Sequence, residues 1–158
     1  MSFFGKHSYL FRSLISLVSF VFLLFPCSSY EVVDQTLYEF EGIELVFGYQ
    51  SGKYEILGFN IFGLLMFIFL LVSIIAPLFY DRKPKLEIII ETFSLLIAVI
   101  LYFLLPITTN HLTKNIEDIF KVNAVIYIGA GLLTISLLLS AFELYRLLKE
   151  SKKNGTIN

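Results

Sequence analysis

The chain has 158 residues, a formal net charge of −1 and a composition that is 57% hydrophobic but only 16% charged. Soluble domains usually carry charge on about a quarter of their residues, so this deficit indicates that much of the surface does not face water. The lack of a basic excess excludes nucleic acid as a partner, and a single cysteine with two histidines offers no internal disulfide and no ordinary zinc site. We therefore predict no cofactor.

Four apolar runs dominate the chain. A helix rises about 1.5 Å per residue and the hydrocarbon core of a bilayer is about 30 Å thick, so roughly 20 apolar residues can cross it. The pattern predicts an all-α transmembrane four-helix bundle that forms a single membrane domain over residues 1–158, with the lipid bilayer as its surroundings. The predicted helices cover residues 9–27, 56–80, 86–107 and 122–145.

The first run is the shortest, because only residues 13–27 are free of charge. It becomes long enough to cross if residues 9–11 also enter the bilayer and the Arg12 side chain snorkels to the lipid headgroups. The same stretch also resembles a signal peptide cleaved before Tyr30, and the residues around Cys27 faintly resemble a lipoprotein signal. We favour a retained helix, and the two alternatives stay open.

Basic residues gather on one side of the predicted helices. They precede the first run, fill the loop at residues 81–85 and follow the fourth run, whereas the other side has only three lysines. Cytoplasmic loops of membrane proteins carry an excess of lysine and arginine. We therefore predict a multi-pass plasma-membrane protein with cytoplasmic N- and C-termini, a cytoplasmic tail at residues 146–158 and an extracellular segment at residues 28–55.

The extracellular segment combines acidic residues with aromatic and β-branched ones. From Thr36 to Phe47 polar and apolar residues roughly alternate, which is the period of a strand, and Gly48 and Ser51-Gly52 are turn signals. We expect a small extracellular β-hairpin between helices 1 and 2. We interpret it as a solvated cap over the helix ends, with a partner-binding or cation-attracting surface as the alternative.

Polar and small residues recur at helical spacing on the third predicted helix, where they share one face. They are Glu87, Glu91, Ser94, Ala98 and Tyr102. Small residues let helix backbones approach closely, and hydroxyl or amide groups can bond across the gap. We infer that this face points into the bundle.

The fourth predicted helix carries a similar series. It consists of Asn123, Tyr127, Ala130, Thr134 and Ala141. We expect this series to face the bundle interior as well. In the second helix, Asn60 is expected to make a hydrogen bond that packs one helix on another.

Glu91 is the candidate site residue of greatest interest, because a charge inside a membrane is costly and often marks function. We expect it to lie near the cytoplasmic interface and to pair with a cation there. The candidate cations are Arg82, Lys83, Lys85 and Arg146. A speculative alternative is an ion path through Glu91 and Glu87. Glu143 has Arg146 three residues further on and is expected to form a surface pair with it.

A resemblance rests on Glu44-Leu45-Val46-Phe47-Gly48 followed by Gly58-Phe59-Asn60-Ile61-Phe62-Gly63. These segments resemble small four-helix membrane proteins of low-GC Gram-positive bacteria that lack an assigned function. The topology is also similar to that of claudin-type tetraspan proteins, with strands between the first two helices. The chain has no tryptophan and no cysteine pair in the outer segment. Claudin-like junction or pore formation is therefore not implied, and no site residues transfer.

The sequence contains no phosphate-binding glycine loop, no HExxH and no GxSxG, so we predict that the protein is not an enzyme. The first hypothesis is a bacterial plasma-membrane protein with a partner-binding, accessory or scaffolding role, whose partner is another membrane protein or a second copy. The alternative is a small ion or solute transporter or channel subunit that uses Glu91.

Overall fold

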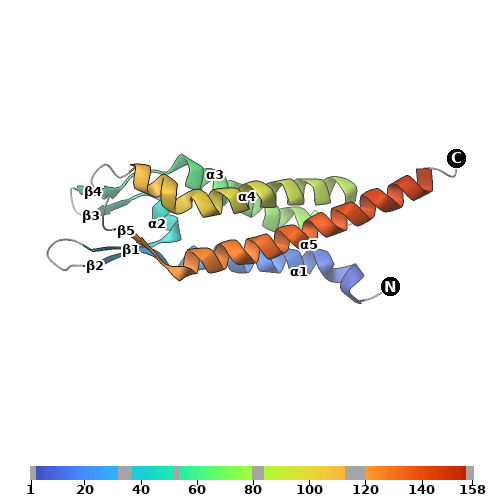
Figure 1. Cartoon of the computed structure of the whole chain (residues 1–158), viewed down its shortest axis with the longest axis horizontal. Helices are drawn as coiled ribbons and strands as arrows, with labels where there is room; N and C mark the ends of the chain where they lie inside the picture. Colours follow the sequence, from blue (N-terminus) through green and yellow to red (C-terminus); the bar gives the residue numbers. More distant parts are fainter. Residues whose placement is uncertain (1–2, 32–36, 52–53, 80–83, 113–119, 156–158) are drawn as a thin grey trace.

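The computed structural model describes residues 3–31, 37–51, 54–79, 84–112 and 120–155. The chain is mostly helical, and its long helices lie side by side with the strands gathered at one end (Figure 1). Both chain ends lie at the opposite end, which we call the terminal end. The helices are α1 (Phe3–Phe22), α2 (Gly42–Phe47), α3 (Ile61–Ile75), α4 (Pro84–Leu112) and α5 (Ala124–Gly155), and α3 continues into the 3-10 helix η1 (Ala76–Phe79).

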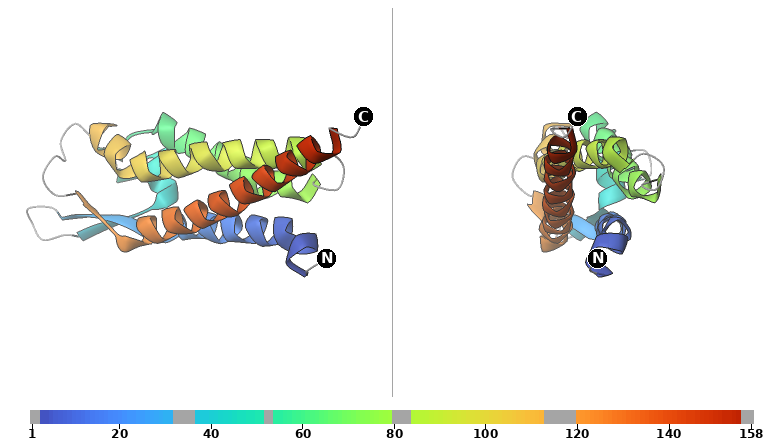
Figure 2. Two further views of the ribbon diagram at one scale, coloured as in Figure 1. Left: turned by 45° about the vertical axis from the view of Figure 1, so that its right-hand side comes forward. Right: turned by 90° about the vertical axis from the view of Figure 1, so that its right-hand side faces the viewer.

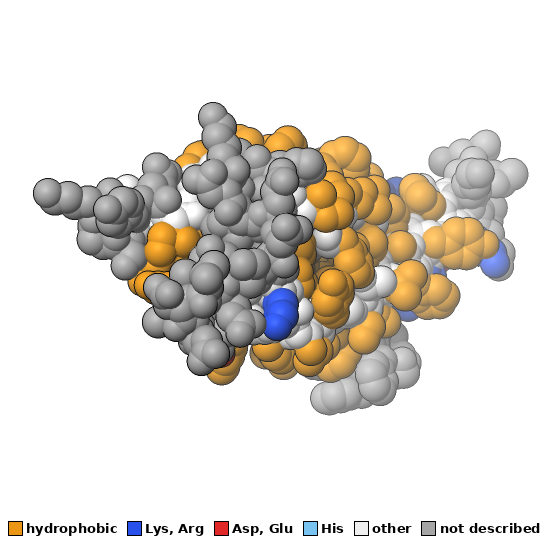
Figure 3. All heavy atoms as spheres, turned by 60° about the vertical axis from the view of Figure 1, so that its left-hand side comes forward, with side chains coloured by type: hydrophobic (Ala, Val, Ile, Leu, Met, Phe, Trp, Pro, Cys, Tyr) orange, Lys and Arg blue, Asp and Glu red, His pale blue; other side chains and the backbone are white. Residues whose placement is uncertain are grey.

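Three of the helical stretches are long and apolar enough to cross a membrane: Ile61–Phe79, Lys85–Thr109 and Ala124–Ser151. The apolar part of α1, Ser8–Phe22, is shorter. Large hydrophobic side chains cover the outside of the helices (Figure 3). Soluble monomers rarely expose such continuous apolar surface, so these faces are suited to lipid. The prediction of a largely helical, membrane-compatible chain is confirmed.

The helix boundaries differ from those predicted. α1 spans Phe3–Phe22 and stops before residues 23–27, because the chain turns there and enters a strand. α3 starts only at Ile61, since Asn60 caps it: the Asn60 Oδ1 accepts the backbone N–H of Phe62 at 3.0 Å and of Gly63 at 3.1 Å. α5 continues to Gly155, so much of the predicted tail is helix.

The strands form two small antiparallel sheets. β1 (Pro26–Glu31) pairs with β2 (Leu37–Glu41) and, on its other edge, with β5 (Phe120–Val122). β3 (Tyr49–Ser51) and β4 (Tyr54–Leu57) form a separate hairpin. The predicted small β-hairpin is therefore present, but the strand that joins β1 from the later connection is not among the predicted elements.

The strand predicted from Thr36 to Phe47 is wrong in its second half. Thr36 lies outside the described residues, and Gly42–Phe47 is the short helix α2. Glu44 Oε2 accepts the backbone N–H of Glu41 at 2.9 Å, a bond that favours a helix start. A Cβ on Gly42 would lie 2.7 Å from Leu23 Cδ2, so the glycine lets α2 begin directly against the chain that leaves α1.

The four long helices α1, α3, α4 and α5 form a ring in which each packs against two neighbours. α1 packs against α3 and α5, and α4 packs against the same two helices. α1 and α4 therefore lie diagonally across from each other, as the view along the helices in Figure 2 illustrates. A side chain that joins α1 to α4 has to run through the interior.

The contact between α4 and α5 depends on a glycine. A Cβ on Gly129 would lie 2.3 Å from the hydroxyl oxygen and 2.8 Å from Cζ of Tyr102, whose side chain is fully buried. A Cβ on Gly131 would meet nothing within 4 Å. Substituting the two glycines therefore compares a closely packed position with an open position on the same helix.

We expect Gly129→Ala to destabilise the fold by about 1–3 kcal/mol, because the buried tyrosine ring must shift. Gly131→Ala should be neutral or stabilising by up to about 1 kcal/mol, since alanine has the higher helix propensity. Denaturant unfolding in detergent micelles measures both. Equal stability of the two variants would contradict the close packing of Tyr102 on Gly129.

Candidate functional site

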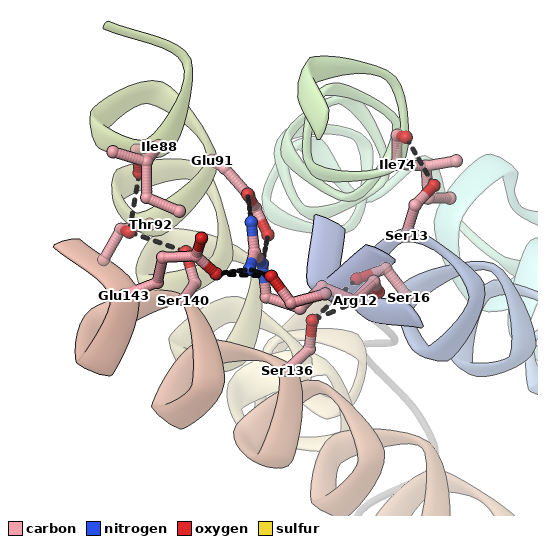
Figure 4. A network of polar contacts seen from close by, with 11 residues as sticks. Arg12, Ser13, Ser16, Ile74, Ile88, Glu91, Thr92, Ser136, Ser140 and Glu143 are labelled. Carbon is pink, nitrogen blue, oxygen red and sulfur yellow. Dashed lines mark hydrogen bonds and ion pairs between the residues drawn. The ribbon is translucent and has the colours of Figure 1, made fainter. Parts of the chain in front are cut away.

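Arg12 is completely surrounded by protein, although it is a charged residue in the first helix. Its side chain extends from α1 and is 1% exposed. Nε donates to Glu91 Oε1 at 2.7 Å and Nη2 donates to Glu91 Oε2 at 3.0 Å, so the guanidinium binds the carboxylate through two bonds (Figure 4). Such paired bonds are the strong form of this contact. The bonds run from α1 to α4 across the diagonal of the packed helices.

Glu143 of α5 completes the arrangement. Arg12 Nη1 donates to Glu143 Oε2, and the Ser8 hydroxyl donates to the same oxygen at 2.6 Å. Glu91 and Glu143 are both buried. We call Arg12, Glu91 and Glu143 the ion cluster. It joins three helices, α1, α4 and α5, at one point.

These contacts correct three sequence predictions. Arg12 does not snorkel to the headgroups, because two carboxylates inside the protein bind it. Glu91 pairs with Arg12 and not with a cation of a loop. The predicted surface pair of Glu143 with Arg146 is replaced by a buried pair with Arg12, while Arg146 lies 3.6 Å from Glu150. In a low-dielectric interior a buried cation is the more favourable partner.

The other cations considered for Glu91 lie elsewhere. Arg82 and Lys83 are outside the described residues. Lys85 is exposed and its ammonium donates to the Ser151 hydroxyl at 3.0 Å. Lys85 and Arg146, the two of these cations that the structure describes, therefore bond other residues and not Glu91.

Hydroxyl groups surround the ion cluster and bond one helix to the next (Figure 4). Ser136 Oγ donates to the backbone carbonyl of Arg12 at 3.3 Å and lies 3.2 Å from Ser16 Oγ. One turn further along the same face of α5, the hydroxyls of Ser140 and Thr92 are 2.7 Å apart. Two further serines of α1 reach backbone carbonyls of neighbouring helices, Ser13 that of Ile74 and Ser19 that of Gly129.

The predicted polar face of α4 is buried along its whole length. Glu87, Glu91, Ser94, Ala98 and Tyr102 are all buried. Glu87 lies about one helical turn nearer the terminal end than Glu91. The structure brings Glu91 together with Arg12 and Glu143, and it keeps Glu87 on the same inner face.

The predicted inner face of α5 is only partly correct. Ala130 is buried, and the half-buried Thr134 donates to the Ala130 carbonyl at 2.8 Å within its own helix. Tyr127 is 56% exposed and Ala141 is exposed. The polar residues that α5 turns inward are Ser136, Ser140 and Glu143.

Asn60 bonds two helices besides capping α3. Its Nδ2 donates to Thr108 Oγ1 at 3.0 Å and to Thr109 Oγ1 at 3.3 Å, both near the end of α4. Asn60 is fully buried. These bonds hold the start of α3 against the last turns of α4 at the strand end.

Arg12 is a site residue that is absent from the predicted candidates. A signal for it exists: Ser8, Arg12, Ser16 and Ser19 follow one another at steps of four, four and three, which places them on one helix face. The same spacing is present in Ser136, Ser140 and Glu143 on α5. Polar faces on two apolar helices indicate a shared interior.

The chemistry available in the ion cluster is that of binding and not of bond making. The guanidinium donates to both carboxylates, and it cannot act as a proton acceptor. Within the described parts of the chain, no group of three or more His, Cys, Asp or Glu side chains could hold a metal ion. The arrangement is suited to fixing helices relative to one another.

Comparison with protein-family models, with curated proteins and with solved structures finds no match to this chain. The resemblance to small bacterial membrane proteins and the claudin-like topology therefore stay predictions. Any functional conclusion rests on the geometry of the chain itself.

Replacing Arg12 by methionine should strongly destabilise the protein. The apolar side chain fills a similar volume but leaves two buried carboxylates without their cation, which costs about 3–5 kcal/mol. Unfolding of the purified variant in mixed detergent micelles measures the loss.

The matched control removes all three charges. Arg12→Met combined with Glu91→Gln and Glu143→Gln should recover most of the stability, because no uncompensated charge remains. A triple variant as unstable as the single one would show that packing around Arg12, and not its charge, holds the helices.

Cys27 lies outside the three long apolar stretches, at the start of β1, and it is fully buried. Burial raises the pKa of its thiol to about 11, and the nearby Glu41 carboxylate acts in the same direction, against a backbone hydrogen bond from Gly42 that lowers it. The reactive thiolate therefore forms only as the pH rises toward 11.

We expect Cys27 to react with a maleimide at pH 8 on the order of 100-fold more slowly than an ordinary thiol, because its thiolate fraction is that much smaller. Mass spectrometry of the labelled chain measures the rate. The control is Cys27→Ser with Gln50→Cys, which puts a thiol at an exposed position of the same end. Equal rates for the two thiols in the folded protein would contradict the burial of Cys27.

Proposed function

We propose that this chain is an integral plasma-membrane protein with four transmembrane helices and a non-catalytic role in binding another membrane protein or a second copy. α1 would supply the fourth crossing. Its contribution of Arg12 to the interior supports this, because a helix whose cation is bound by two other helices belongs permanently to the assembly. The extracellular placement of the strands and the cytoplasmic placement of the termini belong to the same proposal.

The observation that carries the proposal is that polar side chains of the helix interior bond within the protein. Arg12, Glu91, Glu143 and the serine and threonine hydroxyls described above bond one another or backbone carbonyls, and large hydrophobic side chains cover the outside of the helices. A scaffold needs this division, because polar bonds fix the helices while the outside contacts lipid and other helices. The ion path considered for Glu91 and Glu87 is disfavoured, since both oxygens of Glu91 already bind Arg12.

The distribution of charge supports the orientation. Lys85, Arg146 and Lys149 are exposed at the terminal end. Arg12 no longer counts among the loop charges, yet the terminal end keeps its basic excess without it. Both termini lie at that end, which suits an even number of crossings. The positive-inside rule then places that end in the cytoplasm.

The outward face of α5 is the surface we propose for helix contact. Ile128, Ile135 and Leu138 are exposed on it, and Gly131 lies between them with open space around its Cβ position. A glycine flanked by branched side chains allows a second helix to approach closely in lipid. The predicted small residues Ala98 and Ala130 are used inside the chain, so Gly131 is the small residue available for an outside contact on this part of α5.

Site-specific photo-crosslinking in native membranes tests the proposal. A photoreactive residue at Ile135 should form an adduct of defined mass with another helix, while the same residue at Phe93 on α4, which is 62% exposed, should react with lipid. Gly131→Leu should remove the Ile135 adduct, because the leucine side chain would occupy the space through which the second helix approaches. The fold should stay intact, since a Cβ at position 131 would meet nothing within 4 Å.

Lipid adducts alone at both positions would contradict the proposal. A cation or proton flux in proteoliposomes that Glu91→Gln abolishes, with the fold unchanged, would favour the transporter alternative. The two outcomes are independent of each other, because the crosslinking reports on the α5 surface and the flux reports on the interior.

A further inference from the structure

Helix α5 is longer than a membrane crossing requires. Its apolar stretch, Ala124–Ser151, has 28 residues, whereas Ile61–Phe79 has 19. At about 1.5 Å per residue these lengths are about 42 Å and about 28 Å, against a hydrocarbon core of about 30 Å. A typical helix tilt of about 20° shortens the first only to about 39 Å. The final turns of α5 therefore reach the headgroup region at the terminal end, where Figure 1 shows them extending past the other helices.

One side of these turns faces the rest of the protein. Glu143 bonds Arg12, and Leu144 and Leu147 are half-buried. Ser151 accepts a hydrogen bond from Lys85 at the start of α4. These residues fix the rotation of the helix, so its opposite side points away from the protein.

The opposite side combines aromatic and basic residues. Phe142 is 69% and Tyr145 is 63% exposed, and Leu148 is also exposed. Arg146 and Lys149 are exposed next to them. Glu150 is the one exposed acid of the described turns, and its contact with Arg146 is a long one at 3.6 Å between exposed groups.

We propose that this outward side of residues 142–149 is a docking surface for the headgroups of anionic phospholipids. The inference rests on the membrane placement proposed above. Aromatic rings favour the boundary between hydrocarbon and water, and the stems of Arg and Lys lie along apolar surface while their charged ends reach outward. Clustered basic residues next to a membrane helix attract the negative lipid surface at about 1 kcal/mol per residue, which is about a fivefold preference each.

The charge of this surface selects the occupant. A zwitterionic phospholipid would cover the aromatic side chains equally well, but the cation in its headgroup offsets its phosphate, so it brings no net negative charge to the basic groups. A helix of another protein would have to be strongly acidic at its membrane boundary to match them. Anionic lipid satisfies both the apolar and the basic groups with one molecule.

The experiment uses the absence of tryptophan from the chain. Tyr145→Trp introduces a single fluorophore into the full-length protein, which is reconstituted in phosphatidylcholine vesicles containing phosphatidylglycerol. Quenching by brominated phosphatidylglycerol is compared with quenching by brominated phosphatidylcholine at equal amounts. We expect preferential quenching by the anionic lipid that weakens as salt is added. Arg146→Gln and Lys149→Gln should each reduce the preference by about fivefold.

Two controls keep the outcomes separate. Glu150→Gln should retain or increase the preference, because it removes a negative charge from the same turns. Phe93→Trp in α4 should be quenched by both lipids alike, and a lack of quenching at Phe93→Trp would overturn the membrane placement itself.

With Phe93→Trp quenched, equal quenching of Tyr145→Trp by both lipids at low salt would overturn the anionic docking surface. Quenching by neither lipid would also overturn it.

Discussion

A single guanidinium bound by two carboxylates away from water is the constraint on which the rest of this structure depends. Charged groups in a low-dielectric interior are tolerated only when they are paired and hydrogen-bonded, and breaking such a pair is far more costly than never having made it. Arg12 joins α1 to α4 across the diagonal and also reaches Glu143 on α5. These three helices therefore cannot slide or rotate independently of one another.

The ion cluster explains how the remaining polar residues are arranged. Once α1 and α5 are fixed by Arg12 and Glu143, the hydroxyls of Ser16 and Ser136 come within 3.2 Å and Ser19 reaches the carbonyl of Gly129. The close approach of Tyr102 to Gly129 continues this contact toward the strand end. The polar groups named here are thereby turned to the inside, and the exposed side chains on the outside of the helices are mostly hydrophobic. This division is what the proposed contacts with lipid and with a second helix near Gly131 require.

Hydrophobic run length and helical periodicity predicted much of this architecture from the sequence. The three long apolar helices, the inner face of α4 and the presence of a small hairpin before α3 follow from local patterns, although the strand pattern lies at residues 36–47 and the hairpin forms after it. The partner of Glu91 did not follow, because periodicity identifies a face of one helix and carries no information on which residue of another helix opposes it. The predicted headgroup position of Arg12 is wrong for the same reason, because the apolar run length of one helix gives the depth of a residue but not the carboxylates that face it from other helices.

The remaining errors also come from non-local contacts. β5 forms only because residues 120–122 pair with β1 almost a hundred residues earlier. The rotation of α5 is set by Glu143 and the serines, and it turns Tyr127 outward although the spacing of Tyr127, Ala130 and Thr134 favoured an inward face. α2 depends on the contact of Gly42 with Leu23, which alternation of polar and apolar residues does not reveal.

An exchange of the charges between α1 and α4 tests the ion cluster most directly. Arg12→Glu alone and Glu91→Arg alone each place like charges together in the interior, so both should lower the free energy of unfolding in bicelles by several kcal/mol. The double variant puts an arginine on α4 between glutamates on α1 and α5, and we predict that it recovers much of the loss. Single variants as stable as the wild type, or a double variant no more stable than the singles, would show that these charges do not hold the helices together.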